Sequence, residues 1–296
     1  MRYKLLGPTG LRVSELALGT MTFGDDWGWG ASEEESRRIF DRFAEAGGNF
    51  IDTANNYTNG TSERLVGRFV AADRDHFVVA TKYALTERED DPNFGGNHRK
   101  NLLRSINGSL RRLSTDYVDV LWLHMWDGST SLEEVLRAMD DLVRAGKVLS
   151  VGFSDTPAWV VARAVAIADL RGWIQPSAIQ LPYNLAMTEA FTRATQRVGA
   201  DLVTLVEAAR RLGIYVMASA SVHQGQLTRN LPPVVAEFLP GLETDTQRAL
   251  QFVRSTPGIG TALIGMKSTD HVEENALVTG VSPLAAGDFA RLFTPA

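Results

Sequence analysis

Residues 118–151 of the chain read VDVLWLHMWDGSTSLEEVLRAMDDLVRAGKVLSV. A mostly apolar run opens this stretch, and a similar run closes it just after Gly146. Between the two runs, apolar residues step by three and four, which is the spacing of one helix face. These residues are Leu132, Val135, Leu136, Met139, Leu142 and Val143. Runs without polar alternation are typical of parallel strands covered on both faces, so the stretch predicts a strand, a helix and a second, parallel strand.

The same unit recurs along the chain. Helical stripes run from Leu103 to Leu113 and from Leu202 to Leu212, and they alternate with short runs rich in β-branched residues. These runs are eight in number: 16–18, 50–51, 77–80, 118–123, 148–151, 178–181, 214–217 and 261–264. Eight strand–helix units without a linker predict an α/β fold in one domain, residues 1–296, closed as a single (β/α)₈ TIM barrel.

Two further features bear on the fold. Residues 5–13 resemble a β-hairpin around a turn, which we expect to close the bottom of the barrel. The alternative fold is a doubly wound open sheet. Such sheets usually carry Gly-x-Gly-x-x-Gly after the first strand, and this sequence lacks that motif.

Composition narrows the function. The chain has 296 residues, no cysteine and a net charge of −5. These values exclude disulfides and thiolate metal sites, and they argue against a nucleic-acid partner. The five histidines show no metal-ligand spacing, so no metal is expected. The start of the chain does not resemble a signal peptide and no stretch is long enough to cross a membrane, so a cytoplasmic protein is expected.

Polar side chains stand at the ends of consecutive predicted strands. Asp52 ends the second strand and Tyr57 follows five residues later, while Lys82 ends the third and His124 the fourth. Barrel active sites lie at the C-terminal ends of the strands, so these four groups are expected on one face. Each alone also fits a structural role as a turn cap, a packed ring, a solvated cation or a hydrogen-bonded imidazole. Together they favour a catalytic site.

The chemistry of this set is specific. A tyrosine with an ordinary pKa of about 10 exchanges protons poorly at neutral pH, and a neighbouring ammonium lowers that pKa. A carboxylate paired with the ammonium holds it in place, and a histidine can orient a carbonyl oxygen. The four residues therefore suit proton delivery to a carbonyl oxygen while hydride, for which a nicotinamide is the natural donor, attacks the carbon.

Three motifs carry a resemblance to the aldo-keto reductase family. Residues 48–54, GNFIDTA, followed by Tyr57, resemble the family's strand-two signature. Residues 116–124, DYVDVLWLH, resemble its strand-four signature, and residues 80–82, ATK, fit its strand-three lysine. The matches extend over nearly the whole chain in the family's order.

The resemblance implies roles for individual residues. Tyr57 is the general acid, Lys82 and Asp52 lower its pKa, and His124 positions the carbonyl. Ser154, Asp155 and Gln180 meet the nicotinamide carboxamide, and the segment from Gly265 to Asn275 holds the adenosine end. The full set of implied cofactor contacts is Gly19, Thr20, Met21, Asp52, Ser154, Asp155, Gln180, Ser219, Gly265, Met266, Lys267, Ser268, His271, Glu274 and Asn275.

The sequence departs from the family pattern at three places. Asp155 stands where the family commonly has asparagine. Residues 218–222, ASASV, replace the stretch that often supplies an aromatic ring under the nicotinamide, which leaves Tyr183 as a candidate for that role or as a packed rim residue. His271 stands where some members have arginine, so Lys267 is the cation expected to meet a phosphate. We expect NADP(H) rather than NAD(H).

The substrate is expected to be a small carbonyl compound. Trp27, Trp29 and Trp126 follow strands one and four, where they would wall a pocket above Tyr57 and His124 or else pack against loops. Two other functions stay open. One is an aldolase-type lyase with a Schiff base on Lys82, and the other is a cofactor-binding regulatory subunit with little turnover. The sequence leaves the oligomeric state undetermined.

Overall fold

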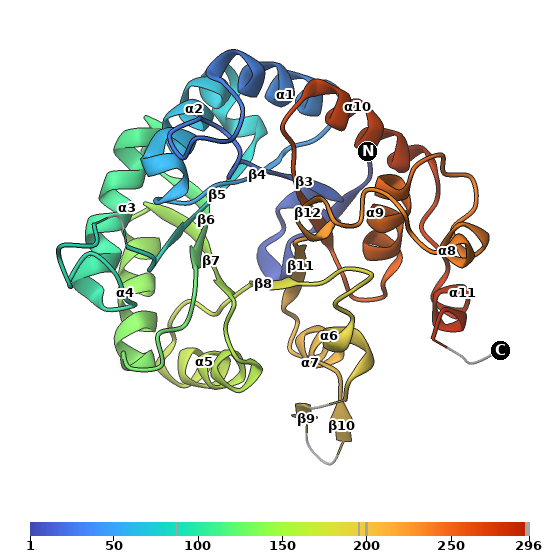
Figure 1. Ribbon diagram of the computed structural model, residues 1–296. Helices are drawn as coiled ribbons and strands as arrows, with labels where there is room; N and C mark the ends of the chain where they lie inside the picture. Colours follow the sequence, from blue (N-terminus) through green and yellow to red (C-terminus); the bar gives the residue numbers. More distant parts are fainter. Residues whose placement is uncertain (87, 195, 199–200, 294–296) are drawn as a thin grey trace.

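The computed structural model describes residues 1–86, 88–194, 196–198 and 201–293. Eight parallel strands form a closed barrel in which each strand pairs with the next in chain order, and the last pairs with the first. Helices surround the strands as an outer ring (Figure 1). The strands are β3 (Leu16–Gly19), β4 (Phe50–Asp52), β5 (Val78–Tyr83), β6 (Val118–Leu123), β7 (Val148–Ser154), β8 (Ala178–Pro182), β11 (Tyr215–Ser219) and β12 (Thr261–Gly265). The predicted (β/α)₈ barrel is confirmed, and each of the eight predicted runs contributes one of these strands.

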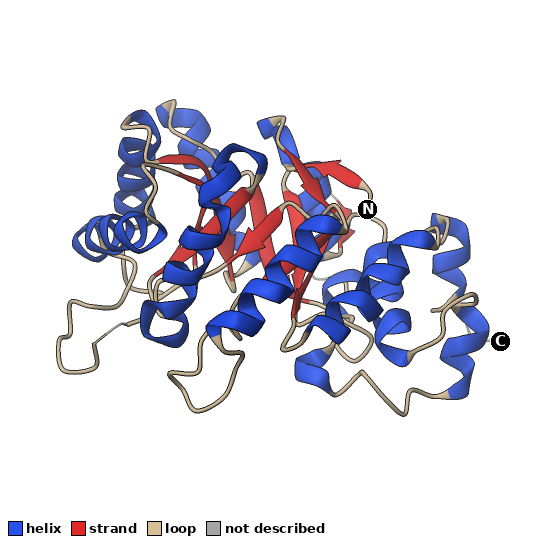
Figure 2. Cartoon of the chain, turned by 90° about the horizontal axis from the view of Figure 1, so that it is seen from above, coloured by secondary structure: helices blue, strands red, loops and turns tan. Residues whose placement is uncertain are grey.

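The helices lie between the strands in sequence and outside them in space. Figure 2 shows the strands enclosed by helices, with long loops extending along one side of the molecule. The longer helices are α1 (Glu33–Glu45), α2 (Thr61–Val70), α3 (Arg99–Leu113), α4 (Leu132–Arg144), α5 (Ala158–Arg171), α9 (Asp245–Ser255) and α10 (Thr269–Leu277). The shorter ones are α6 (Glu189–Thr192), α7 (Leu205–Arg211), α8 (Pro233–Phe238) and α11 (Ala286–Arg291). Within the described residues, no helix is long and apolar enough to cross a membrane.

Two hydrophobic clusters hold this arrangement. The larger one lies between the strands and the helices, and the smaller one fills the barrel interior with residues such as Phe50, Trp122 and Met217. Side chains on a barrel strand point alternately inward and outward. The inward positions of each strand can therefore be identified from the interior cluster.

The N-terminal hairpin closes one end of the barrel, as predicted. Strands β1 (Tyr3–Leu5) and β2 (Arg12–Ser14) pair antiparallel. Leu6 and Val13 are fully buried and belong to the interior cluster. Gly7 has a φ of 55°, and a Cβ there would lie 2.5 Å from the carbonyl oxygen of Ser177, just before β8 begins. The backbone of the hairpin thus packs against the N-terminal ends of the strands.

One helix is shorter than predicted. The stripe that starts at Leu202 predicts a helix from there, but α7 begins at Leu205 because the Thr204 hydroxyl accepts the backbone N–H of Glu207 at its start. Leu202 lies instead in β10 (Asp201–Val203), which pairs antiparallel with β9 (Gln196–Val198). The sequence analysis did not predict this hairpin.

Candidate active site

Strand alternation brings the predicted catalytic residues to one end of the barrel interior. On β5, Val78 and Ala80 belong to the interior cluster, so Lys82 points inward two residues further on. By the same alternation, the interior residue Phe50 indicates that Asp52 on β4 points inward, and the interior residue Trp122 indicates the same for His124 just after β6. Each polar residue occupies the last inward position of its strand or the position just beyond it. The end of the barrel opposite the hairpin is therefore lined by charged and polar groups.

Lys82 is the centre of this group. Its Nζ donates to an Asp52 carboxylate oxygen, to the backbone oxygen of Thr53 at 3.1 Å and to the Tyr57 hydroxyl at 3.3 Å. Lys82 and Asp52 are each 1% exposed. The other Asp52 oxygen accepts from Nε2 of Gln180 at 3.2 Å. The structure thus brings Asp52, Tyr57, Lys82 and Gln180 into one hydrogen-bonded cluster.

The electrostatics keep Lys82 charged. Burial lowers the pKa of Lys82, but Asp52 and Tyr57 together raise it by more than burial lowers it. The pKa of Lys82 therefore lies above its usual value. Burial raises the pKa of Asp52, and Lys82 opposes that change. A buried ammonium bonded to a carboxylate is a fixed positive charge beside the Tyr57 oxygen.

Tyr57 is protonated in this site. Burial raises the pKa of its hydroxyl above the usual value, and the Lys82 ammonium acts in the opposite direction. The implied lowering of this pKa by Lys82 and Asp52 is therefore not found: burial outweighs the Lys82 charge, and the Asp52 negative charge raises the pKa further. Asp52 acts on Tyr57 indirectly, by holding Lys82.

His124 lies beside Tyr57, with ring centroids 6.0 Å apart and an interplanar angle of 79°. Burial and the nearby Lys82 charge lower the pKa of His124 to about 3, so the ring is neutral at physiological pH. Its buried Nδ1 has no hydrogen-bond partner among the described residues. Orphaned buried nitrogens are uncommon in folded proteins and often mark a functional site. A neutral imidazole can orient a carbonyl oxygen but is a poor source of a proton.

The residues predicted to meet the nicotinamide line the next part of the rim. Ser154 ends β7 and is 3% exposed, and its register partner on β8 is Gln180. Asp155 follows with a φ of 41°, a left-handed conformation that asparagine and aspartate tolerate better than most residues. Ser219 ends β11 and is half-buried. The left-handed backbone alone is a sufficient reason for an Asp or an Asn at position 155, whether or not the side chain contacts a cofactor.

The predicted adenosine segment lies at the end of β12 and along α10. Gly265 and Lys267 are exposed, Met266 is buried, and the Lys267 N–H donates to His271 Nδ1 at 3.3 Å. Asn275 is 3% exposed, and its Oδ1 has no hydrogen-bond partner among the described residues. The remaining predicted residues of this segment, Ser268 and Glu274, are half-buried.

The loop after β3 connects both ends of this rim. Thr20 donates its backbone N–H to the backbone oxygen of Asp52 at 3.0 Å, Gly19 pairs with Asp52 in the sheet, and Met21 is exposed. Further along, the Lys267 Nζ lies 4.9 Å from the ring centroid of Trp29. This loop therefore contacts both the Asp52 end and the Lys267 end of the predicted cofactor site.

The aromatic residues have different surroundings. The rings of Trp27 and Trp29 lie 5.6 Å apart, and Trp27 Nε1 donates to Asn59 at 3.3 Å. Trp126 is half-buried and packs against the outer core. Tyr183 is fully buried, stacks on Phe252 and meets Thr256, so it is a packed core residue and not a ring for the nicotinamide. The pocket assignment of Trp27, Trp29 and Trp126 stays a prediction.

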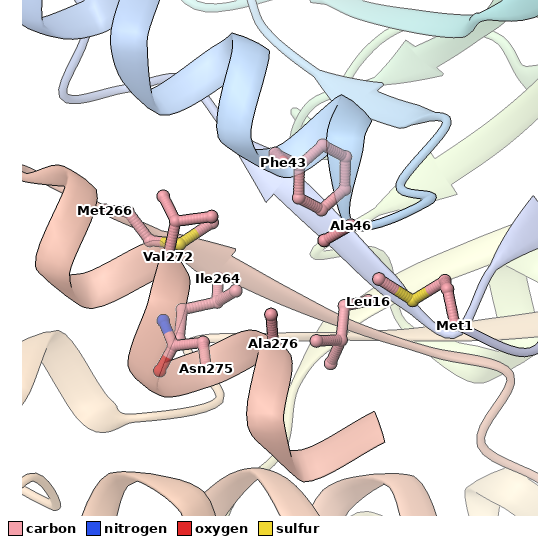
Figure 3. Close-up of a pocket in the computed structure, with 9 residues that line it drawn as sticks. All are labelled: Met1, Leu16, Phe43, Ala46, Ile264, Met266, Val272, Asn275 and Ala276. Carbon is pink, nitrogen blue, oxygen red and sulfur yellow. The ribbon is translucent and has the colours of Figure 1, made fainter. Parts of the chain in front are cut away.

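A cavity beside α10 is too small for a substrate. Figure 3 shows its lining by residues from β3, α1, β12 and α10, including Leu16, Phe43 and Asn275. Its volume is about 10 Å³, the space of about one water molecule. It does not include Asp52, Tyr57, Lys82 or His124.

Sequence reasoning missed two supporting networks. The fully buried Glu63 accepts from Thr81 Oγ1 at 2.5 Å and from Arg112 Nε at 2.6 Å, which braces β5 next to Lys82. The Ser62 hydroxyl lies within hydrogen-bond distance of Thr20 and Thr53. Both residues are polar positions at the start of α2, and only their burial distinguishes them from solvent-exposed ones. A single sequence does not reveal that burial.

The chain belongs to the aldo/keto reductase family, whose model matches residues 15–233. It is 48% identical over 181 residues to a norsolorinic acid reductase of Emericella nidulans, which covers 57% of this chain and 47% of that protein. It is 44% identical over 186 residues to the aryl-alcohol dehydrogenase [NADP(+)] of Phanerodontia chrysosporium, covering 58% of this chain and 48% of that protein. The chain spans about half the length of these curated relatives.

The fold has a solved counterpart. The aldo-keto reductase AKR11C1 from Bacillus halodurans, in its holo form, superposes with a TM-score of 0.78. The match covers 99% of this chain and 96% of that chain at 24% identity. At this identity the likeness shows a shared barrel fold.

Proposed function

We propose that this chain is an NADP(H)-dependent oxidoreductase that reduces an aldehyde or ketone to an alcohol within one domain, residues 1–296. The observation that carries the proposal is the Tyr57 hydroxyl 3.3 Å from the Lys82 Nζ, whose other partners are Asp52 and the backbone oxygen of Thr53. Tyr57 is the protonated acid, and Lys82 stabilises the phenolate that remains after proton transfer.

The residues present fit a nicotinamide dinucleotide. The orphaned Asn275 Oδ1 would accept from the adenine amino group, and the exposed Lys267 would face a phosphate. Ser154, Asp155 and Gln180 would hold the carboxamide, with Ser219 and the segment Gly19–Met21 close by. When bound there, NADPH supplies hydride to the carbonyl carbon.

The side chains of the site then act on the carbonyl oxygen. His124, held neutral, would orient that oxygen through an imidazole N–H. Tyr57 would donate its proton as negative charge develops there, and the fixed Lys82 charge would lower the free energy of the resulting phenolate. Solvent would return a proton to Tyr57 after the alcohol departs.

We propose aryl aldehydes and ketones as the substrate class. Two of the similar proteins carry the names norsolorinic acid reductase and aryl-alcohol dehydrogenase. Trp27, Trp29 and Trp126 would supply the flat apolar walls that an aromatic ring requires. The preference for NADP(H) rests on Lys267 and on the NADP(+) in the name of the second relative. The cytoplasmic location expected from the sequence stays a prediction.

The aldolase alternative requires a neutral lysine amine. Lys82 has its pKa raised by Asp52 and Tyr57, which favours the reductase. A regulatory subunit would bind NADPH with little turnover, and kinetics distinguish it from a reductase.

The experiment is NADPH oxidation, followed at 340 nm, with a panel of aryl and aliphatic aldehydes and ketones. We expect turnover with aryl carbonyls and weaker turnover with NADH. NADPH binding without turnover would support the regulatory subunit, and trapping of a carbonyl substrate on Lys82 by borohydride would support the lyase. Absence of NADPH binding would contradict the proposed function.

A further inference from the structure

The turn that follows Tyr57 has an unusual backbone. Thr58, Asn59 and Gly60 have φ values of 44°, 54° and 83°, so three consecutive residues are left-handed. Glycine adopts this conformation without strain and asparagine tolerates it, but a β-branched residue is strained there. Thr58 is also fully buried. A strained, buried threonine persists only where its surroundings hold it in place.

The Thr58 hydroxyl supplies that restraint. Its Oγ1 donates to the backbone oxygen of Phe23 at 2.7 Å and accepts from the backbone N–H of Ser62 at 3.0 Å. One side chain therefore ties the turn to the loop after β3 and to the first residues of α2. Alanine or glycine at this position would leave both backbone partners without the Thr58 hydroxyl.

The loop after β3 is itself fixed at this contact. Its two ends bridge at Phe23 and Ala31, with the Gly24 N–H donating to the Ala31 oxygen at 2.9 Å. A Cβ on Gly24 would lie 3.2 Å from Thr58 Oγ1, so the backbone of Gly24 packs closely against the Thr58 side chain. The Thr58 hydroxyl thus bonds to a well-anchored acceptor.

Tyr57 depends on the Thr58 hydrogen bonds for its position more than Lys82 and Asp52 do. Lys82 and Asp52 lie on strands β5 and β4, where sheet hydrogen bonds fix their backbones. Tyr57 lies outside the barrel strands, and its N–H bonds to the Ala54 oxygen at 3.2 Å. Its hydroxyl must nevertheless stay 3.3 Å from Lys82 Nζ.

We propose that Thr58 is a positioning residue for proton transfer, and that its two hydrogen bonds hold the left-handed turn that aims the Tyr57 hydroxyl at Lys82. The inference rests on the proposed function in assigning the proton to Tyr57. Thr58 itself acts through the turn and needs no contact with the substrate.

The test compares four variants with the wild type. Thr58→Ala and Thr58→Gly remove the hydroxyl, and glycine also removes the left-handed strain, so it guards against loss of folding. Thr58→Ser keeps the hydroxyl. Thr61→Ala is the matched control, because the Thr61 hydroxyl donates to Asp26 of the same loop and accepts from Arg64 of α2, while only the Thr61 backbone, which the substitution keeps, bonds to Thr58.

We expect kcat to fall about 10- to 100-fold in Thr58→Ala and Thr58→Gly with KM changed less than about threefold, as for a misplaced catalytic group. Thr58→Ser and Thr61→Ala should stay within about twofold of the wild type. A purely structural role predicts a lower melting temperature without this kcat effect in the folded fraction, which would overturn the proposal.

A crystal structure of Thr58→Gly provides a readout that needs no turnover. We expect the Tyr57 hydroxyl to lie beyond hydrogen-bond distance of Lys82 Nζ, with Asp52 and Lys82 still paired. A Tyr57 hydroxyl in its wild-type place would overturn the inference. If the wild type reduces no carbonyl compound but this displacement is seen, the proposed function fails and the positioning role of Thr58 is supported.

Discussion

Among the described residues, two ion pairs have both side chains almost fully buried, one near each end of the barrel, and they differ in the groups that surround them. Glu15 precedes β3 and pairs with Arg254 of α9, and both side chains are fully buried. Asp52 and Lys82 form the second pair at the opposite end of the barrel. Arg254 also donates to Gln251 and to the backbone oxygens of Val278 and Val281. The Glu15–Arg254 pair therefore has its hydrogen bonds supplied by the protein.

The Asp52–Lys82 pair is also bonded to the protein, but it lies beside two groups that a ligand could use. Lys82 also contacts the Tyr57 hydroxyl, and the neighbouring His124 Nδ1 has no partner among the described residues. A buried pair with structural partners alone is expected to stabilise one conformation, whereas a pair beside a titratable hydroxyl and an orphaned nitrogen is expected at a ligand site. Two similar ion pairs thus differ in their surroundings, and in the proposed function one serves stability and the other reactivity.

Replacing Lys82 should have the largest effect on activity. Lys82→Met removes the charge proposed to stabilise the Tyr57 phenolate, so we expect kcat for carbonyl reduction to fall about 10²- to 10⁴-fold. Steady-state kinetics on the folded variant would measure this change. A kcat within tenfold of the wild type would contradict the proposal that the Asp52–Lys82 pair, unlike the Glu15–Arg254 pair, takes part in the reaction.

Replacing Arg254 should have the largest effect on stability. Arg254→Met leaves Glu15 buried without its partner, so we expect the free energy of unfolding to fall by about 3–5 kcal/mol. Urea unfolding measures the change, and kcat of the folded fraction should stay near the wild-type value. Arg37→Ala is the control, since its i,i+4 pair with Asp41 is exposed and worth about 0.3–0.5 kcal/mol. Equal losses in the two variants would contradict the stabilising role of the Glu15–Arg254 pair.

Replacing Lys267 tests the cofactor end of the rim. Lys267→Ala removes an exposed cation. We expect the Kd for NADPH to rise about tenfold, because a charge-assisted contact to its 2′-phosphate is lost. The Kd for NADH, which has no 2′-phosphate, should stay unchanged. Fluorescence titration measures both constants. The exposed Lys100 at the start of α3 provides the control variant Lys100→Ala. A parallel weakening of both cofactors would assign Lys267 to a role other than phosphate recognition.

The smallest expected effect concerns pH. His124 has a folded-state pKa of about 3, below its ordinary value of about 6.5, so the folded protein binds fewer protons than the unfolded chain. Its contribution to stability is present above pH 6.5 and is lost progressively as the pH falls toward 3. We expect the melting temperature to drop less between pH 7.5 and 5 in His124→Gln than in the wild type. Equal drops would mean that His124 is not held neutral.

The sequence predicts those features that depend on local pattern. The continuous apolar runs are sufficient to predict where the barrel strands lie. The predicted strand ends in turn place Asp52, Lys82 and His124 on one face of the barrel. The helix stripe fails at Leu202, because periodicity extends through a residue that lies before the Thr204 cap. Helix boundaries depend on such caps more than on the stripe.

Contacts between distant residues are not predictable in this way. Glu15 and Arg254 meet across 239 positions, and nothing near either residue indicates a partner. The Thr58 hydroxyl bonds depend on a left-handed turn that residue type disfavours. The pKa of Tyr57 is likewise set by burial, which only the packed structure defines.

The most direct test of the central claim is single-turnover oxidation of bound NADPH by an aryl aldehyde in Tyr57→Phe. The substitution removes the hydroxyl at the end of the Lys82 chain and leaves both ion pairs in place. We expect NADPH to bind as in the wild type and the rate to fall at least about 100-fold. A wild-type rate with intact NADPH binding would show that the proton comes from another group, which would contradict the assignment of Tyr57.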